Sequence, residues 1–131
     1  MKNNFTFQLN NQLLFGIGKT LEIIEILAAN DWSNIVLAVD GGVAKNSGYY
    51  QKIKFLFKNS DILVTEIQLR ENEEPSYDYL DKIADKIRTI SHLDAIIGIG
   101  GGSALDITKA VGGLYTNPGP GIDYRGFDKL S

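Results

Sequence analysis

The feature that most constrains the fold is a short run that is apolar on both faces, Asn34–Asp40, with the sequence NIVLAVD. A strand with one face in water alternates apolar and polar residues, whereas this run keeps Ile, Val, Leu, Ala and Val consecutive. Consecutive apolar residues are typical of a parallel strand that helices cover on both sides. The run therefore predicts a buried parallel strand in an α/β domain.

The rest of the chain alternates strands and helices in the same way. Helical spacing of apolar residues predicts a helix after Gly18 and helices over 47–59, 76–90 and 103–114. Further strands are predicted at 5–9, 61–67 and 94–99. This order predicts an α/β, Rossmann-like fold with a mainly parallel sheet and flanking helices. No strand or helix pattern follows Thr116, so we expect the sheet to be incomplete at the C-terminus.

Composition excludes several classes of protein. The chain has 131 residues, 44% of them hydrophobic, which suits one globular domain. The net charge of -3 favours neither a nucleic-acid nor an anionic-membrane partner. Cysteine is absent and His92 is the only histidine, so a site built from several imidazoles or thiolates cannot form from this chain alone. No apolar run approaches the roughly 18 residues of a membrane span, and a cytoplasmic location is expected.

The best candidate for a functional site is the turn Gly100-Gly101-Gly102-Ser103, between a predicted strand and a predicted helix. Glycines let the backbone approach a ligand closely, and the start of a helix offers unpaired N–H groups to a phosphate. The alternative is a purely structural turn. Ser103 and Asp106 have capping-box spacing, which predicts Ser103 as the N-cap. The two interpretations are compatible, and three glycines exceed what a turn needs.

Asp40 is the second candidate, because it ends a strand and precedes two glycines. An acid in this place accepts hydrogen bonds from a ribose diol in dinucleotide-binding folds, and it would favour NAD over NADP. It could equally be a turn aspartate that binds nearby N–H groups. The Gly16–Thr20 segment fits neither the P-loop spacing G-x-x-x-x-G-K-[ST] nor the dinucleotide-binding spacing G-x-G-x-x-G. It is therefore interpreted as a structural turn. The acidic run Glu71–Pro75 is most simply a solvated loop, with a metal or cofactor contact as the alternative.

The residues from Ile97 to Ala110 (IGIGGGSALDITKA) closely resemble the G-G-G-S-x-x-D-x-[AT]-K-A signature of iron-containing (group III) alcohol dehydrogenases. Phe15–Gly18 looks like the opening F-G-x-G turn of that family. Val36–Asp40 looks like its strand ending in a ribose-binding aspartate, and Glu74-Pro75-Ser76 occupies the place of its N-P-T element.

The resemblance implies an NAD(P)-binding region in residues 1–115, followed by a Pro/Gly-rich loop and tail in 116–131. Asp40 would hold the adenosine ribose, and Gly101, Gly102 and Ser103 would hold the pyrophosphate, with the adjoining Gly100 counted among the cofactor-binding residues. Asp106 would lie near the nicotinamide, and Glu74 stands where the family has an asparagine. Relatives continue into a helical domain that binds Fe²⁺ or Zn²⁺ through an aspartate and three histidines. The sequence resembles about the first third of such an enzyme, so we expect no metal binding and no activity from this chain alone.

The resemblance therefore indicates the cofactor-binding portion of an enzyme that transfers a hydride between a small alcohol or aldehyde and nicotinamide. Two alternatives stay open. One is a non-catalytic nucleotide-binding or interaction module, and the other is a fragment of a relative like glycerol dehydrogenase or dehydroquinate synthase. An open sheet edge also favours self-association, for example as a homodimer.

Overall fold

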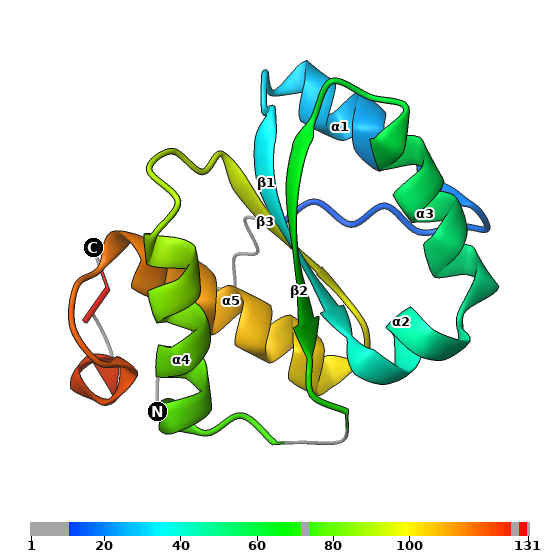
Figure 1. The fold of residues 1–131 in the computed structure, drawn as a ribbon. Coiled ribbons are helices and arrows are strands. Elements are labelled where there is room, and N and C mark those ends of the chain that lie inside the picture. Colours follow the sequence, from blue (N-terminus) through cyan, green and yellow to red (C-terminus); the bar gives the residue numbers. More distant parts are fainter. Residues whose placement is uncertain (1–10, 72–73, 127–128, 131) are drawn as a thin grey trace, which may run out of the picture.

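A computed structural model describes residues 11–71, 74–126 and 129–130. Its centre is a parallel three-stranded sheet in the order β2-β1-β3 (Figure 1). The strands are β1 (Asn34–Asp40), β2 (Leu63–Leu69) and β3 (Ala95–Ile99). The middle strand β1 is the run predicted to be buried, and all five residues between its two ends are buried. The predicted α/β, Rossmann-like class is confirmed, while the expected strand at 5–9 lies outside the described residues.

Helices cover both faces of the sheet, with α4 and α5 on one face and α1, α2 and α3 on the other (Figure 1). In chain order the helical elements are the 3-10 helix η1 (Lys19–Glu22), α1 (Ile23–Ala29), α2 (Gly41–Asn46), α3 (Gly48–Lys58), α4 (Tyr77–Arg88), α5 (Gly102–Thr116) and the 3-10 helix η2 (Gly121–Tyr124). Each connection between parallel strands passes through a helix, as this type of sheet requires.

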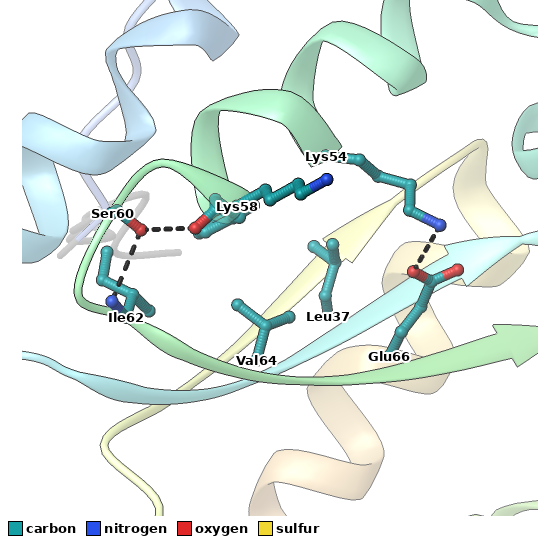
Figure 2. A pocket seen from close by; sticks show the side chains of 8 residues that line it. Leu37, Lys54, Lys58, Ser60, Ile62, Val64 and Glu66 are labelled. Atoms are coloured by element: carbon teal, nitrogen blue, oxygen red, sulfur yellow. Dashed lines mark hydrogen bonds and ion pairs between the residues drawn. The ribbon is translucent and has the colours of Figure 1, made fainter.

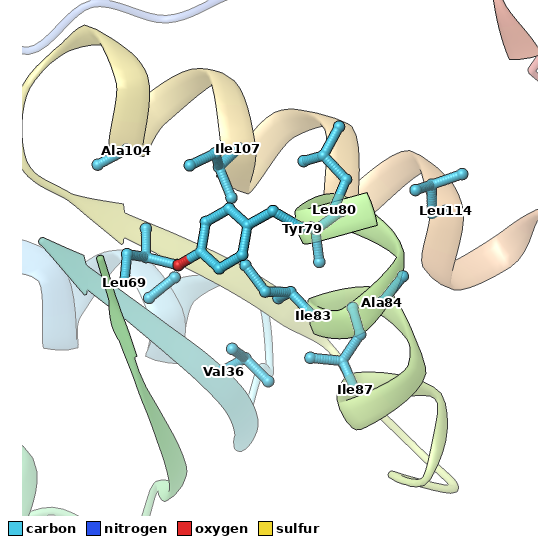
Figure 3. Close-up of a cluster of buried hydrophobic side chains, with 12 residues drawn as sticks. Val36, Leu69, Tyr79, Leu80, Ile83, Ala84, Ile87, Ala104, Ile107 and Leu114 are labelled. Atoms are coloured by element: carbon cyan, nitrogen blue, oxygen red, sulfur yellow. The ribbon is translucent and has the colours of Figure 1, made fainter. Parts of the chain in front are cut away.

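The two faces of β1 belong to two separate hydrophobic clusters, because successive side chains of a strand point in opposite directions. Val36 and Ala38 belong to the cluster with α4 and α5, and Figure 3 shows Val36 on that side of the sheet. Ile35, Leu37 and Val39 face α1 and α3. The consecutive apolar residues of β1 are thus explained by the fold, since each face of this strand is covered by helices.

Gly98 in β3 has no side chain, and this lets α5 pack close to the sheet. A Cβ atom at Gly98 would lie 2.5 Å from Oγ1 of Thr108 on α5. The Thr108 hydroxyl is buried there and donates to the carbonyl of Ala104 at 2.7 Å. The position of α5, and of the turn before it, therefore depends on glycine at position 98.

Several predicted boundaries are wrong. β1 does end at Asp40, just before Gly41 and Gly42, but these glycines also begin α2, a helix that the sequence did not predict and that the Asp40 carboxylate caps. β2 begins and ends two residues later than predicted, since its pairing runs from Asn34 with Leu63 to Asp40 with Leu69. The last helix continues to Thr116, and η2 lies in the segment 116–131 that was predicted to be only loop and tail.

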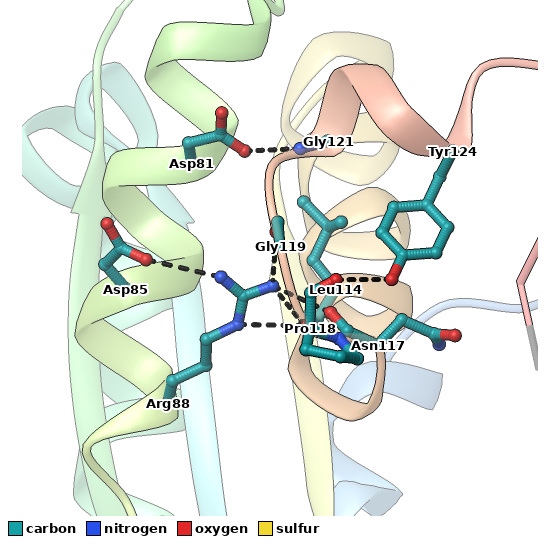
Figure 4. A network of polar contacts seen from close by, with 9 residues as sticks. All are labelled: Asp81, Asp85, Arg88, Leu114, Asn117, Pro118, Gly119, Gly121 and Tyr124. Atoms are coloured by element: carbon teal, nitrogen blue, oxygen red, sulfur yellow. Dashed lines mark hydrogen bonds and ion pairs between the residues drawn. The ribbon is translucent and has the colours of Figure 1, made fainter.

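The segment after α5 is held against α4 by Arg88 (Figure 4). One guanidinium nitrogen, Nη2, donates to the carbonyl oxygens of Leu114, Asn117 and Gly119 at 2.8, 2.8 and 2.9 Å. About two turns earlier on α4, the carboxylate of Asp81 accepts the N–H of Gly121 at 2.7 Å. Carbonyl groups at and after the end of α5 have no N–H partner in a following helical turn, and the Arg88 guanidinium supplies their hydrogen bonds.

Asp94 joins the amino ends of β1 and β3. Its Oδ2 accepts the backbone N–H groups of Ser33 and Asn34 at 2.8 and 2.9 Å, and its Oδ1 lies 2.8 Å from Nε2 of His92. The hydrogen bonds from Ser33 and then Asn34 hold the pKa of the Asp94 carboxyl below its ordinary value, and the neighbouring His92 adds to the effect. His92 itself is a surface residue between a helix and a strand, as predicted.

Replacing Arg88 should loosen the segment after α5. We expect Arg88→Ala to lower the free energy of unfolding by about 2 kcal/mol, because several carbonyls lose a charged donor. Arg88→Lys should recover only part of this loss, since an ammonium cannot reproduce the planar fork. Chemical denaturation measures the effect, with the exposed Lys82→Ala on the same helix as control. Equal stability of Arg88→Ala and Lys82→Ala would contradict the assignment.

Asp94 should make stability depend on acid pH. A carboxyl whose pKa is lowered on folding stabilises the protein fully above the ordinary aspartate pKa of about 4. That contribution is lost as the pH falls through the lower folded value. We therefore expect Asp94→Ala to be less stable than the natural chain at pH 7, with the difference shrinking below pH ~4. Urea unfolding across pH measures it, and Asp61→Ala, an exposed loop carboxylate, should show no such trend.

Candidate functional site

The candidate site lies at the carboxyl edge of the sheet, between β1 and β3. β1 leads into α2 and α3 on one face, while the neighbouring β3 leads into α5 on the other. Where adjacent parallel strands turn to opposite faces, a crevice opens outside their carboxyl ends, and ligands of α/β proteins bind in such crevices. Asp40 ends β1 here, and Gly100 follows the last residue of β3.

Gly100 brings the two strand ends into direct contact. Its φ of +154° lies in a region that other residues rarely adopt. A Cβ atom at this position would lie 2.7 Å from the Cβ of Ala104 and 2.8 Å from the Cβ of Asp40. No side chain fits between these two atoms, so glycine is required for Asp40 to lie beside the start of α5.

The next two glycines have a different role. A Cβ atom added to Gly101 or Gly102 would meet no heavy atom within 4 Å. Packing within the described chain therefore does not explain why these positions lack side chains. Their bare backbone borders open space, which is the arrangement that a closely approaching ligand requires.

A pocket of about 150 Å³ brings most of the predicted residues together. It is lined by Asp40, Arg70, Gly101, Gly102, Ser103, Ala104 and Ile107. The first turn of α5 forms one wall, and its leading N–H groups have no partner within the helix. These donors and the positive end of the helix dipole favour an anion at this wall.

The capping box predicted at Ser103 is wrong. Gly101 is the N-cap of α5, no side chain caps the helix, and Ser103 lies in its first turn. The first helical hydrogen bond runs from the N–H of Leu105 to the carbonyl of Gly101 at 3.1 Å. The helix begins two residues earlier than the spacing suggested, because the geometry of Gly100 already turns the chain there. The Ser103 hydroxyl is consequently not used as a cap.

Asp40 is confirmed as a turn aspartate. Its Oδ1 accepts the N–H groups of Gly42 and Val43 at 2.9 and 3.1 Å and so caps α2. Both bonds end on the same carboxylate oxygen. The other carboxylate oxygen, Oδ2, is not used in this cap, so capping α2 is compatible with a contact to a ribose. That ribose contact stays a prediction.

Glu74 and Asp106 are not brought into this pocket. Both residues are exposed, Glu74 in the loop before α4 and Asp106 in the second turn of α5. Neither is among the lining residues. Their cofactor contacts remain predictions from the family resemblance.

Arg70 is the lining residue that sequence reasoning missed. It directly follows β2, and its backbone N–H donates to the hydroxyl of Tyr79 at 2.9 Å. Its guanidinium carbon lies 4.7 Å from the centre of the Tyr79 ring, within the range of a cation–π contact. The available signal was its position, because a cation just after a parallel strand reaches the edge at which ligands bind.

A second pocket, of about 330 Å³, lies between α3 and the strands (Figure 2). Lys54 in its wall pairs with Glu66 at 3.1 Å, and Lys58 and Ser60 also line it. Burial, and then the charge of Glu66, raise the pKa of the neighbouring Tyr50 hydroxyl, which therefore stays protonated. None of the predicted site residues lies in this pocket.

The described part of the chain contains neither a cluster of metal ligands nor a membrane-spanning helix. No group of three or more His, Cys, Asp or Glu side chains is placed to hold a metal ion there. No helix of those residues is long and apolar enough to cross a bilayer. Gly16 and Gly18, both with positive φ, form the turn before η1, as the structural interpretation of that segment predicted.

Comparisons with known proteins agree with this geometry. The family model described as iron-containing alcohol dehydrogenase matches residues 10–130. Alcohol dehydrogenase 4 of Schizosaccharomyces pombe is 31% identical over 120 residues, which are 90% of this chain and 27% of that protein. Sulfoacetaldehyde reductase of Bilophila wadsworthia is 32% identical over 120 residues, 89% of this chain and 30% of that protein.

A solved structure shares the fold. NADH-dependent butanol dehydrogenase A of Thermotoga maritima superposes with a TM-score of 0.81 at 24% identity, over 92% of this chain and 30% of that one. The chain thus spans less than a third of the length of the relatives that it matches. Because the family model covers nearly all of its residues, the chain belongs to the iron-containing alcohol dehydrogenase family.

Proposed function

We propose that this chain is the nicotinamide-dinucleotide-binding portion of a metal-dependent alcohol dehydrogenase. The observation that carries the proposal is the single pocket in which Asp40 meets the glycine-rich start of α5. Among the relatives, two Bacillus subtilis proteins are named probable NADH-dependent butanol dehydrogenases, and a sulfoacetaldehyde reductase of Bifidobacterium kashiwanohense was solved with NAD⁺. These names support the same type of cofactor here.

The residues of the pocket suit the two polar parts of a dinucleotide. The N–H groups at the start of α5, with the Ser103 hydroxyl, would hold the pyrophosphate, and the bare backbone of Gly101 and Gly102 leaves room for it. The Asp40 oxygen that does not cap α2 would accept hydrogen bonds from the adenosine ribose diol. Its negative charge favours NAD over a cofactor that carries a phosphate on that ribose.

A bound nicotinamide would supply hydride exchange with the carbon of a small alcohol or aldehyde. The chain's own residues hold the other end of the cofactor and fix its direction across the crevice. In the intact enzyme, Fe²⁺ or Zn²⁺ bound outside this chain would polarise the substrate oxygen.

The proposal also includes a cytoplasmic location and a homodimer. The homodimer is proposed because the outer edges of β2 and β3 pair with no strand in the described part of the chain.

Two glycines offer a matched test of the pocket. Gly102 and Gly48 are each the first residue of a helix, and a Cβ atom at either would meet nothing within 4 Å. Alanine at either position should therefore leave thermal stability at or slightly above that of the natural chain. Only Gly102→Ala places a methyl group in the pocket, and we expect it to weaken NADH binding about tenfold, since overpacking costs ~1–3 kcal/mol.

Fluorescence titration with NADH measures this effect. Gly48→Ala should bind NADH as the natural chain does. Saturable binding that is unchanged in Gly102→Ala would place the cofactor elsewhere, and no saturable binding by the natural chain would remove the proposed function.

Binding without turnover is expected of the 131-residue chain. His92, its only histidine, lies beside Asp94 at the amino end of the strands, at the edge opposite the pocket. We therefore expect no NADH formation from butanol and NAD⁺ with Fe²⁺ or Zn²⁺ added. Absorbance at the NADH band measures it, and metal-dependent turnover by the purified chain would contradict the prediction.

A further inference from the structure

Arg70 lies at the ribose side of the proposed cofactor site. It follows Leu69, which is the residue of β2 that pairs with Asp40 in β1. Gly100 follows Ile99, on the other side of β1. The order along the carboxyl edge is therefore Arg70, Asp40, Gly100, with about 4.8 Å between neighbouring strands. Asp40 separates Arg70 from the glycine turn where a pyrophosphate would lie.

Tyr79 fixes the position of Arg70. The buried phenol of this α4 residue accepts the Arg70 N–H at 2.9 Å, and its ring lies under the guanidinium at 4.7 Å. A cation held on a rigid ring loses less conformational freedom on binding than a solvated side chain does. Arg70 is thus preorganised at the rim of the pocket.

There is also space beside Arg70 for a group larger than a hydroxyl. Arg70 lines a neighbouring pocket of about 380 Å³, together with Lys45, Gln68, Leu69 and Glu71. Lys45 forms an ion pair with Glu71 in this neighbouring pocket of about 380 Å³. Because Arg70 lines both pockets, a substituent on a ribose held by Asp40 could extend past the guanidinium into the neighbouring space.

We infer that Arg70 is a specificity-determining residue that binds the 2′-phosphate of NADP(H), so that the crevice accepts NADP(H) as well as NAD(H). The inference rests on the proposed function, since it places the ribose at Asp40. An aspartate alone repels a 2′-phosphate, whereas an adjacent arginine accommodates one. The guanidinium presents a planar set of donors that matches phosphate oxygens two at a time. NADH lacks this phosphate, so a contact with Arg70 would not increase its binding affinity.

The test is a set of fluorescence titrations with NADH and NADPH on the natural chain, Arg70→Gln, Arg70→Lys and Lys58→Gln. Lys58 is the control for loss of one positive charge, because it lines the separate pocket between α3 and the strands. Arg70→Gln should weaken NADPH binding about tenfold or more and leave NADH binding within about twofold, as expected for loss of a charged hydrogen-bond partner. Arg70→Lys should be intermediate for NADPH, and Lys58→Gln should change neither cofactor.

Each other outcome identifies which statement fails. Equal weakening of NADH and NADPH in Arg70→Gln would place Arg70 on the pyrophosphate or in the fold, and unchanged NADPH binding would remove its role. Both results overturn the inference, as does a natural chain that binds NADH but not NADPH, and all three leave the proposed function standing. A natural chain that binds neither cofactor overturns both. Thermal unfolding of each variant checks that the Tyr79 contact is not needed for folding, and Arg70→Lys serves if Arg70→Gln unfolds.

Discussion

The contact between the Gly100 turn and Asp40 is the one on which the geometry of the site depends. It joins the ends of the two strands that turn to opposite faces, and it has no room for a side chain. The same turn starts α5, so the first N–H groups of that helix lie at the crevice rather than above the sheet. Gly98 acts one step earlier, because it lets Thr108 and the whole of α5 lie against β3.

Charge at the carboxyl edge is arranged around this contact. Asp40 stands in the middle, with the dipole of α5 on one side and Arg70 on the other. The aspartate already uses one oxygen to cap α2, which holds the carboxylate in a fixed direction. A single side chain therefore supports a helix and, in the proposed function, orients a ribose. At the opposite edge, Asp94 fastens the amino ends of β1 and β3, so carboxylates organise both ends of the central strand.

Predictions from the sequence were most accurate where the pattern was local and repeated. The apolar run of β1 and the amphipathic spacing of α4 identified both elements to within a few residues. They were least accurate at glycines. Gly41 and Gly42 do follow the end of β1, but no pattern in the sequence indicated that α2 begins at Gly41, where a Cβ atom would lie 2.9 Å from the carbonyl oxygen of Leu69. Ser103 matched a capping box, but the close approach at Gly100 starts the helix before it. Arg70 was missed because its role depends on β2 lying beside β1, a pairing between segments far apart in the chain.

The sequence by itself determined the α/β class and the family, and it identified candidate cofactor-binding residues that include Asp40 and Gly100–Ser103. These inferences depend on short-range patterns of apolar residues and glycine. Only the tertiary structure decided which of those residues share a pocket, since strand order and register place side chains that are distant in sequence. It left Glu74 and Asp106 exposed outside the pocket, added Arg70 to it and placed Arg88 under the segment after α5. Such contacts are made across the sheet and between helices, and no spacing along the chain encodes them.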